Sequence, residues 1–282
     1  MAKTLSGKPV RLAIEQALEK KIAALALDYV FPVLATVRVG TDPADARYEQ
    51  TIVDRLRPLG IKVRRFMLPD TVTQEEVAAL LTQLDADPLY SAVLLFRPLP
   101  RSFDEEALCR LVRPEKDVDC MNPLSLGRVF TDPKHAFAPC TAAACMALLR
   151  HYEIPLRGKR AVVLGRSNVV GKPLAQLLLS EDATVTVCHS KTEDLPNLCR
   201  EADILIAACG KARLVDESCI KPGAVVLDVG IHPGPDGLCG DVDFEKVLPL
   251  AGAITPVPGG IGGITVALLA KQETEAAERN AS

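Results

Sequence analysis

Residues 161–173 decide the fold of this chain, with the sequence AVVLGRSNVVGKP. The apolar run from Ala161 to Leu164 predicts a buried strand, Gly165 to Gly171 a tight turn, and Lys172 onward a helix. Such a unit points backbone N–H groups and a helix N-terminus at an anion, usually the pyrophosphate of a dinucleotide. The glycine spacing is G-x5-G rather than G-x-G-x-x-G, so a purely structural strand–helix turn is the alternative.

An alternating pattern continues after this turn. The segment Asn122–Pro139 is rich in Pro, Gly and Asp and predicts a linker. A helix is expected at 141–152, followed by strand 161–164, helix 172–180, strand 184–188, helix 194–200, and strands 203–208 and 224–229. Strands that alternate with helices indicate βαβ units and a parallel sheet, here a Rossmann-like domain.

The first part of the chain shows the same alternation. Helices are expected at 10–26, 46–57 and 74–84, the last capped by Thr71 or Thr73, and strands at 33–39, 61–67 and 91–96. A final helix at 265–279 carries an apolar stripe and is expected to pack on the first domain. The predicted fold class is therefore α/β, with two α/β domains.

Composition narrows the class of protein. The chain has 282 residues, 48% hydrophobic and 24% charged, with a net charge of -3 and no strongly basic block. These values predict a globular protein and argue against nucleic acid as a partner. The N-terminus lacks an apolar signal-peptide core and no run is long enough to cross a membrane, so a cytoplasmic location is expected.

The nine cysteines lack any C-x-x-C pair, and the four histidines have no spacing typical of a metal site. Neither a disulfide framework nor a bound metal is predicted. Cys140, Cys145, Cys188 and Cys209 lie in apolar runs and are interpreted as small buried hydrophobes.

The strand after the glycine turn bears on the choice of dinucleotide. NAD sites usually carry an acidic residue at its end for the ribose 2′-hydroxyl. This strand ends in His189-Ser190-Lys191, without a carboxylate, and Arg166 lies in the turn beside it. A guanidinium suits a 2′-phosphate, so the sequence favours NADP over NAD. Arg166 as a solvated turn residue is the alternative.

Two further segments follow predicted strands, at the edge where ligands bind in open α/β sheets. They are Cys209-Gly210-Lys211 and Asp228-Val229-Gly230-Ile231. Asp228 is equally compatible with capping a local turn.

Several segments together resemble the bifunctional methylenetetrahydrofolate dehydrogenase/cyclohydrolase family. They are residues 165–173, 188–192, 228–231, 240–242 and 255–260, preceded by Leu5–Lys8, Pro114–Asp119 and Pro139–Thr141. The resemblance covers essentially the whole chain in order. It implies a protomer of two α/β domains with a cleft between them, and a homodimer. The resemblance places folate in residues 1–138 with the C-terminal helix 265–282, and NADP in the Rossmann-like residues 139–264. Family members oxidise 5,10-methylenetetrahydrofolate to the methenyl cation and hydrolyse that cation to 10-formyltetrahydrofolate.

The resemblance also implies site residues. Tyr48 and Asp119 are the candidate catalytic residues. The candidate substrate-binding residues are Tyr48, Ile52, Phe96, Asp119, Pro258, Gly259 and Gly260. The candidate cofactor-binding residues are Thr141, Gly165, Arg166, Ser167, Val170, Gly171, His189, Ser190, Cys209, Gly210, Asp228, Gly230 and Ile231. Without the family, Tyr48 is compatible with a packing role and Asp119 with a turn carboxylate.

The chain departs from the family on the substrate side. The family's Tyr-x-x-x-Lys pair is Tyr48 and Ile52 here, and its glutamine before a Leu-Pro-Leu-Pro turn is Phe96, followed by Arg97. Its glycine after the aspartate is Cys120, and the loop 258–265 loses one proline. Ile52 and Phe96 offer neither a lone pair nor a proton donor for activating water.

The sequence thus predicts an NADP-dependent dehydrogenase with weak or absent cyclohydrolase activity. Arg97 is either a local replacement that orients water or binds the folate tail, or a surface cation. The competing hypotheses are a non-catalytic folate or dinucleotide binder and a dehydrogenase for another pterin carrier.

Overall fold

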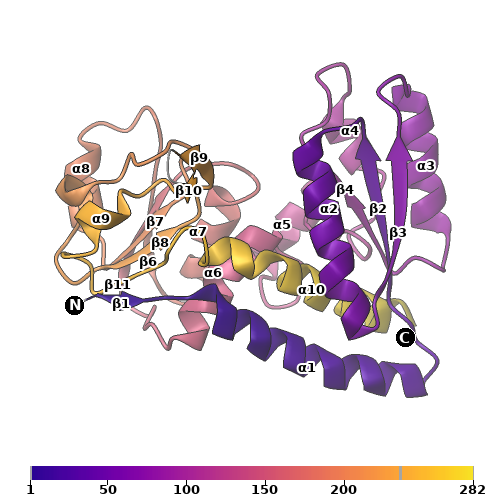
Figure 1. The fold of residues 1–282 in the computed structure, drawn as a ribbon, viewed down its shortest axis with the longest axis horizontal. Coiled ribbons are helices and arrows are strands. Elements are labelled where there is room, and N and C mark those ends of the chain that lie inside the picture. The colour runs from indigo at the N-terminus through magenta and orange to yellow at the C-terminus, as the bar shows by residue number, and fades with distance from the viewer. Residues whose placement is uncertain (1, 235–236, 282) are drawn as a thin grey trace. The chain divides into compact units, whose positions relative to one another are not determined.

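A computed structural model describes residues 2–234 and 237–281 (Figure 1). The chain divides into two compact units. Unit 1 comprises Met1–Leu12 and Thr141–Thr265, and unit 2 comprises Ala13–Cys140 and Val266–Ser282. Within the described residues, no helix combines the length and the apolar character that crossing a membrane requires.

Unit 1 is built on a six-stranded sheet with the order β1-β11-β8-β7-β5-β6. Its strands are β1 (Lys3–Thr4), β5 (Arg160–Leu164), β6 (Thr184–Cys188), β7 (Ile204–Ala207), β8 (Val225–Asp228) and β11 (Ala253–Ile254). All neighbouring strands are parallel. The carboxyl ends of β5 to β8 therefore reach one edge of the sheet, where ligands bind in this class of fold.

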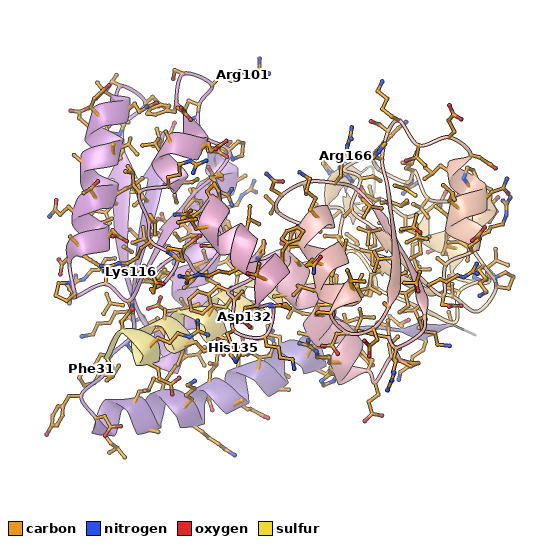
Figure 2. The ribbon with its side chains drawn as sticks, turned by 180° about the vertical axis from the view of Figure 1, so that it is seen from behind. Phe31, Arg101, Lys116, Asp132, His135 and Arg166 are labelled. Carbon is orange, nitrogen blue, oxygen red and sulfur yellow. The ribbon has the colours of Figure 1, made fainter. Side chains whose placement is uncertain are left out.

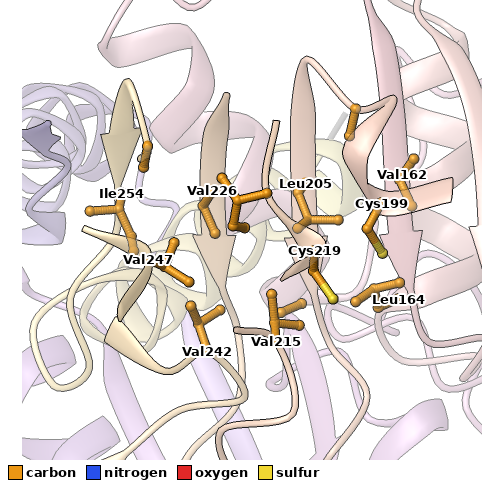
Figure 3. Close-up of a cluster of buried hydrophobic side chains, with 14 of the residues drawn as sticks. Val162, Leu164, Cys199, Leu205, Val215, Cys219, Val226, Val242, Val247 and Ile254 are labelled. Carbon is orange, nitrogen blue, oxygen red and sulfur yellow. The ribbon is translucent and has the colours of Figure 1, made fainter. Parts of the chain in front are cut away.

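The other elements of unit 1 follow the predicted alternation. They are α6 (Cys140–His151), α7 (Gly171–Leu179), α8 (Leu195–Arg200), α9 (Phe244–Val247), the 3-10 turns η2 (Glu217–Cys219) and η3 (Ile261–Gly263), and the hairpin strands β9 (His232–Gly234) and β10 (Gly237–Cys239). The central strands β5, β7 and β8 are nearly continuous apolar runs, as expected for strands covered on both faces. Figure 3 shows Val162, Leu205 and Val226 packed with Cys199 and Cys219.

The N-terminal residues belong to unit 1, whereas the sequence placed 1–138 together in the first domain. Lys3 and Thr4 pair with Ala253 and Ile254. The Leu5 amide donates to the Ile254 carbonyl at 2.8 Å, and the Leu5 side chain is buried. A strand of two residues is too short to show a period in the sequence, so this pairing was not predicted.

Unit 2 is built on a smaller parallel sheet with the order β3-β2-β4. Its strands are β2 (Val33–Val39), β3 (Lys62–Leu68) and β4 (Ala92–Leu95), and its first helices are α1 (Gly7–Leu27), α2 (Pro43–Leu56) with the 3-10 turn η1 (Arg57–Leu59), α3 (Gln74–Ala86) and α4 (Glu105–Cys109). Helix α1 begins in unit 1 and continues into unit 2. Thr73, one of the two predicted caps, begins α3 with a complete capping box to Glu76.

The predicted linker 122–139 is wrong in part, because it contains helix α5 (Pro123–Thr131). Asn122 caps this helix by accepting from the Leu124 amide, and Pro123 occupies its first turn. Proline is favoured at that position, since its missing N–H has no partner there in any case. The helix was missed because asparagine and proline, which begin it, are also common in loops.

The C-terminal helix α10 (Thr265–Ala281) packs on unit 2, as its apolar stripe predicts. Two buried polar side chains fix it there. The Gln272 amide donates to the carbonyls of Val118 and Ala138 at 2.6 and 3.0 Å. The Ser91 hydroxyl donates to the Glu273 carboxylate. Segments far apart in the sequence are thereby joined into one core.

Glu273 makes the stability of unit 2 dependent on pH. Burial raises the pKa of its carboxyl from the ordinary 4.5 to about 7, although Ser91 and Lys116 favour the charged form. The folded protein binds this proton more tightly than the unfolded chain, so the stability contributed by Glu273 is fully present below pH 4.5 and is lost as pH rises through 7. The complete fall corresponds to about 3 kcal/mol.

Glu273→Gln should remove most of this fall, because the amide does not ionise. Urea unfolding at pH 5 and pH 8 measures it. Glu275→Gln, on the same helix and paired with Lys271 nearer the surface, is the matched control and should keep the wild-type dependence. An unchanged difference between the two pH values in Glu273→Gln contradicts the assignment.

Candidate active site

The glycine turn of unit 1 is held by close backbone packing. Gly165 has a φ of +126°, and a Cβ there would lie 2.1 Å from the Ala208 carbonyl oxygen. A Cβ on Gly171, the first residue of α7, would lie 2.0 Å from the Gly165 carbonyl oxygen. Only glycine fits both positions. The end of β5 and the start of α7 therefore approach closely enough for backbone N–H groups to cradle a phosphate.

A pocket of about 360 Å³ opens beside this turn, at the carboxyl ends of β5, β6 and β7. Figure 2 labels Arg166 in the loop that follows β5. Six predicted residues line the pocket: Gly165, Arg166, Ser167, His189, Ser190 and Cys209. The lining also contains Leu164, Cys188, Leu195, Ala208, Lys211 and Leu214, which the candidate set omitted. Lys211 lies in the loop that follows β7, so its place after a predicted strand was the available signal.

The charge of this pocket is positive. Arg166 and Lys211 line it, and among the described residues no Asp or Glu does so. The loop after β6 is folded by its own contacts, with the His189 amide donating to the Thr192 hydroxyl at 2.9 Å. This loop presents His189 and Ser190 to the pocket. An anionic group fits such a lining better than a sugar hydroxyl that needs a carboxylate.

Two buried carboxylates support the loops behind the pocket. Asp241 accepts hydrogen bonds from the amides of Cys209 and Gly210 at 2.7 and 3.0 Å, and His232 Nε2 lies 2.7 Å from its other oxygen. Asp228 accepts from the amides of Gly230, Asp241 and Val242. Burial raises the pKa of the Asp228 carboxyl to about 6, against the effect of these donors.

Asp228 therefore has the turn-capping role that was its alternative interpretation, and its contact with a cofactor stays a prediction. Asp241 was not among the candidate residues, although it lies in one of the quoted family segments. The remaining candidates lie outside the pocket lining: Thr141 in α6, Val170 and Gly171 at the start of α7, and Gly210, Gly230 and Ile231 in loops after strands. Their cofactor contacts also stay predictions.

The predicted loop Pro258-Gly259-Gly260 belongs to unit 1. The Gly7 amide donates to the Gly259 carbonyl at 2.8 Å. A Cβ on Gly7 would lie 2.2 Å from the Gly260 carbonyl oxygen. The loop is thus fixed against the N-terminal segment, whose Leu5–Lys8 motif also belongs to the resemblance.

In unit 2, helix α2 presents Tyr48 and buries Ile52. Asp42 caps the helix through the Ala44 amide, and the face that packs inward carries Glu49, Ile52 and Leu56. Ile52 is 0% exposed and Tyr48 is 40% exposed. The Tyr48 ring contacts Phe96 edge-on, with 5.9 Å between ring centroids. Tyr48 and Phe96 therefore meet near the end of β4, and Ile52 lies one turn further along α2, on its buried face.

A buried polar contact that the sequence did not indicate holds α2 in register. The Thr36 hydroxyl donates to the Glu49 carboxylate at 2.7 Å, and Arg38 Nε lies 3.6 Å from the other Glu49 oxygen. Glu49 directly follows Tyr48 and is almost fully buried. The position of the Tyr48 ring thus depends on a carboxylate that takes no part in the candidate chemistry.

Asp119 lies in the loop before α5. Its Oδ1 accepts from the Cys140 amide at 3.0 Å, and its Oδ2 is 3.9 Å from Arg97 Nη2. The neighbouring Asp117 serves the loop itself, since it accepts from the amides of Met121 and Asn122 and from the Ser125 hydroxyl. Asp119 is therefore the carboxylate of this pair that remains partly accessible.

The cysteines agree in part with the sequence interpretation. Cys140, Cys145 and Cys188 are buried, whereas Cys209 is only half-buried and lines the pocket. Burial raises the pKa of the Cys145 and Cys209 thiols to about 12, which keeps both protonated. Within the described residues, no group of three or more His, Cys, Asp or Glu side chains is placed to hold a metal ion.

Comparison with known families identifies both units. Residues 5–119 match the tetrahydrofolate dehydrogenase/cyclohydrolase catalytic domain, and residues 139–281 match the NAD(P)-binding domain of the same proteins. The chain belongs to this family. The predicted family, the two-domain α/β fold and the enzyme class, a dinucleotide-dependent tetrahydrofolate dehydrogenase, are confirmed.

Individual relatives match over nearly their whole length. The chain is 46% identical to the bifunctional protein FolD 1 of Desulfitobacterium hafniense over 95% of this chain and 96% of the relative. A solved FolD dehydrogenase/cyclohydrolase from Campylobacter jejuni has a TM-score of 0.96 and 37% identity over 99% of both chains. The Trypanosoma brucei enzyme, solved with NADP and an inhibitor, has a TM-score of 0.93 and 36% identity over 99% of this chain and 98% of that one. These matches support the predicted cofactor, NADP.

Gly171→Ala should damage both folding and cofactor binding, because the added methyl group meets backbone atoms that cannot turn away. The expected loss is about 1–3 kcal/mol of unfolding free energy, with weaker NADP binding. Gly127→Ala is the control, since a Cβ there meets nothing within 4 Å. Thermal unfolding and NADP titration measure both effects. Wild-type affinity in Gly171→Ala would contradict the close-packing argument.

Proposed function

We propose that this protein oxidises 5,10-methylenetetrahydrofolate to 5,10-methenyltetrahydrofolate with NADP, and that it hydrolyses the methenyl product weakly or not at all. The single observation that carries the second part is the pair Ile52 and Phe96. They are 0% and 7% exposed and stand where the family's pattern has lysine and glutamine. The first part rests on the family match and on the glycine turn.

NADP is favoured over NAD by the lining of the unit 1 pocket. Arg166, Ser167 and Ser190 supply a guanidinium and two hydroxyls. A phosphate accepts hydrogen bonds from all three, and the guanidinium adds charge. The Trypanosoma brucei relative holds NADP in its crystal structure.

Arg166→Ala should therefore raise the KM for NADP by about 10- to 100-fold, the range for losing a hydrogen bond to a charged group. The KM for NAD should change by less than about threefold. Lys172→Ala is the control, because Lys172 lies in the same segment but donates to Asn168 at 2.9 Å and does not line the pocket. Initial rates with each cofactor measure both values. Equal losses with NADP and NAD would count against a 2′-phosphate contact.

The proposed oxidation requires the protein mainly to position the substrate against the cofactor and to stabilise the positive charge that develops on the substrate. NADP accepts the hydride when it is bound. Asp119 holds the pterin by hydrogen bonds and favours the positive charge that develops as the hydride leaves. Tyr48, fixed by its contact with Phe96, shapes the pocket wall. Pro258, Gly259 and Gly260 are further substrate-binding candidates.

Hydrolysis of the methenyl cation also requires a group that activates water. A water molecule must be oriented and deprotonated, which needs a basic group within hydrogen-bond reach. Ile52 and Phe96 provide no such group, and their burial keeps water away. Arg97 lies next to Phe96, but a guanidinium is a hydrogen-bond donor without an acceptor site, so it is a poor base.

Wild-type protein should accelerate NADPH formation from methylenetetrahydrofolate and leave methenyltetrahydrofolate hydrolysis at the buffer rate. The absorbance of both compounds allows both rates to be followed. Ile52→Lys with Phe96→Gln restores the family's pair and should gain hydrolysis, while Ile52→Met with Phe96→Leu, which keeps both sites apolar, should not. Clear hydrolysis by the wild type would refute the proposed loss.

A non-catalytic binder of folate or dinucleotide is the second candidate, and the loss of two polar residues at positions 52 and 96 is what favours it. It predicts binding of NADP without any NADPH formation. Ile52 and Phe96 also suit a dehydrogenase for another pterin carrier, for which methylenetetrahydrofolate would be a poorer substrate than a related reduced pterin.

The assembly and setting of the protein are further parts of the proposal. A homodimer is supported by the family resemblance and by the edge strand β6, whose Val187 is 38% exposed. A cytoplasmic location and the absence of nucleic acid and membrane partners are supported by composition and by a net charge of -3.

A further inference from the structure

Arg97 is the one charged side chain next to the candidate pterin carboxylate that the family's pattern does not contain. It follows Phe96, whose amide donates to the Val37 carbonyl at 2.9 Å and so fixes the end of β4. Its Nη2 lies 3.9 Å from Asp119 Oδ2. The side chains of Arg97 and Asp119 are 20% and 26% exposed. The ion pair is thus largely sheltered from solvent but open on one side.

The rest of the environment shows that Arg97 acts mainly on this carboxylate. Asp119 is the only acidic residue with which it forms an ion pair in the part of the chain that the structure describes. Its positive charge also opposes the rise that burial causes in the pKa of the Cys109 and Cys120 thiols, at the end of α4 and directly after Asp119. The second oxygen of Asp119 is held by the Cys140 amide. Both carboxylate oxygens therefore have partners within the protein.

The proposed reaction changes the charge of its substrate. The methylene carbon and its nitrogens are neutral, whereas the methenyl product carries one positive charge after the hydride leaves. A site with Asp119 alone carries one negative charge and binds the cation more tightly than the neutral substrate. A cation placed beside Asp119 offsets part of that charge and reduces this preference.

We infer that Arg97 is a specificity-determining residue that weakens binding of the cationic product relative to the neutral substrate. This inference rests on the proposed function of the site. It also agrees with the changes at positions 52 and 96. An enzyme that hydrolyses the cation in place benefits from holding it, whereas one that lacks the hydrolytic groups must release it for a separate hydrolase. Ile52, Phe96 and Arg97 then serve one purpose, the early release of an unhydrolysed cation.

Equilibrium binding to the purified full-length protein tests the inference without turnover. Methenyltetrahydrofolate is titrated at a mildly acidic pH at which it is stable, and methylenetetrahydrofolate is titrated without NADP. Arg97→Leu should bind the methenyl cation at least about fivefold more tightly, the scale expected for removing a partly screened neighbouring charge. Its affinity for the methylene compound should change by less than about twofold. The ratio of the two dissociation constants is the measured quantity.

Two variants separate charge from structure. Arg97→Lys keeps the cation and should keep the wild-type ratio. Arg101→Leu removes an exposed arginine four residues further along the same segment, and should leave both affinities unchanged; Figure 2 labels this residue at the end of its loop. A ratio in Arg97→Leu equal to that of the wild type would overturn the inference, as would weaker binding of the cation.

The outcome is distinguishable from failure of the proposed function. If the wild type binds neither pterin, or binds both but forms no NADPH, the proposed dehydrogenase function fails. If the wild type turns over and Arg97→Leu shows an unchanged ratio of affinities, only the role of Arg97 fails.

Discussion

The contact between the backbones of Gly165 and Gly171 is the constraint on which the cofactor half of this protein depends. A Cβ on Gly171 would lie 2.0 Å from the Gly165 carbonyl oxygen. The end of β5 and the first turn of α7 therefore pack directly on each other. The neighbouring Ala208 carbonyl, at the end of β7, closes the other side. Three elements are therefore fixed at one sheet edge, and the pocket lined by Arg166 and Ser190 follows from that arrangement.

The substrate half depends on different physics. Its framework is polar and buried: Glu49 bonds Thr36 beneath Tyr48, and Gln272 ties α10 to the loop before Asp119. On this framework we propose a shift in the chemistry. Ile52 and Phe96 are apolar, and Arg97 lies beside Asp119. In this proposal the charge of the site is rearranged rather than simply lost, and the fate of the product changes with it.

Much of the fold and part of the candidate site could be predicted from the sequence, for physical reasons. Strands 33–39 and 184–188 were predicted with the bounds that the structure shows. Residues 33–39 form a mostly apolar run between Pro32 and Gly40, and residues 184–187 alternate threonine with valine, and both patterns favour a strand. Six pocket residues were predicted because parallel strands end at one edge. The resemblance, rather than periodicity, supplied Tyr48 and Asp119.

The other features of the fold and of the candidate site could be recognised only from the structure. Helix α5 was hidden because Asn122 and Pro123 begin helices as readily as they make turns. Asp241 and Glu49 act through hydrogen bonds to residues distant in the sequence, and no local pattern records such partners. The Arg97–Asp119 ion pair joins residues 22 positions apart, and no sequence pattern indicates that the chain brings them together.

The pairing of β1 with β11 bears on how the protein is made. Residues 3–5 complete the sheet of unit 1 only when residues 252–254 have been synthesised, and unit 2 lacks the Gln272 and Glu273 contacts until α10 exists. Each unit is thus closed by sequence from the far end of the chain. Neither unit can complete these contacts until residues 252–254 and 272–273 have left the ribosome, so the last folding step of each unit comes late in synthesis.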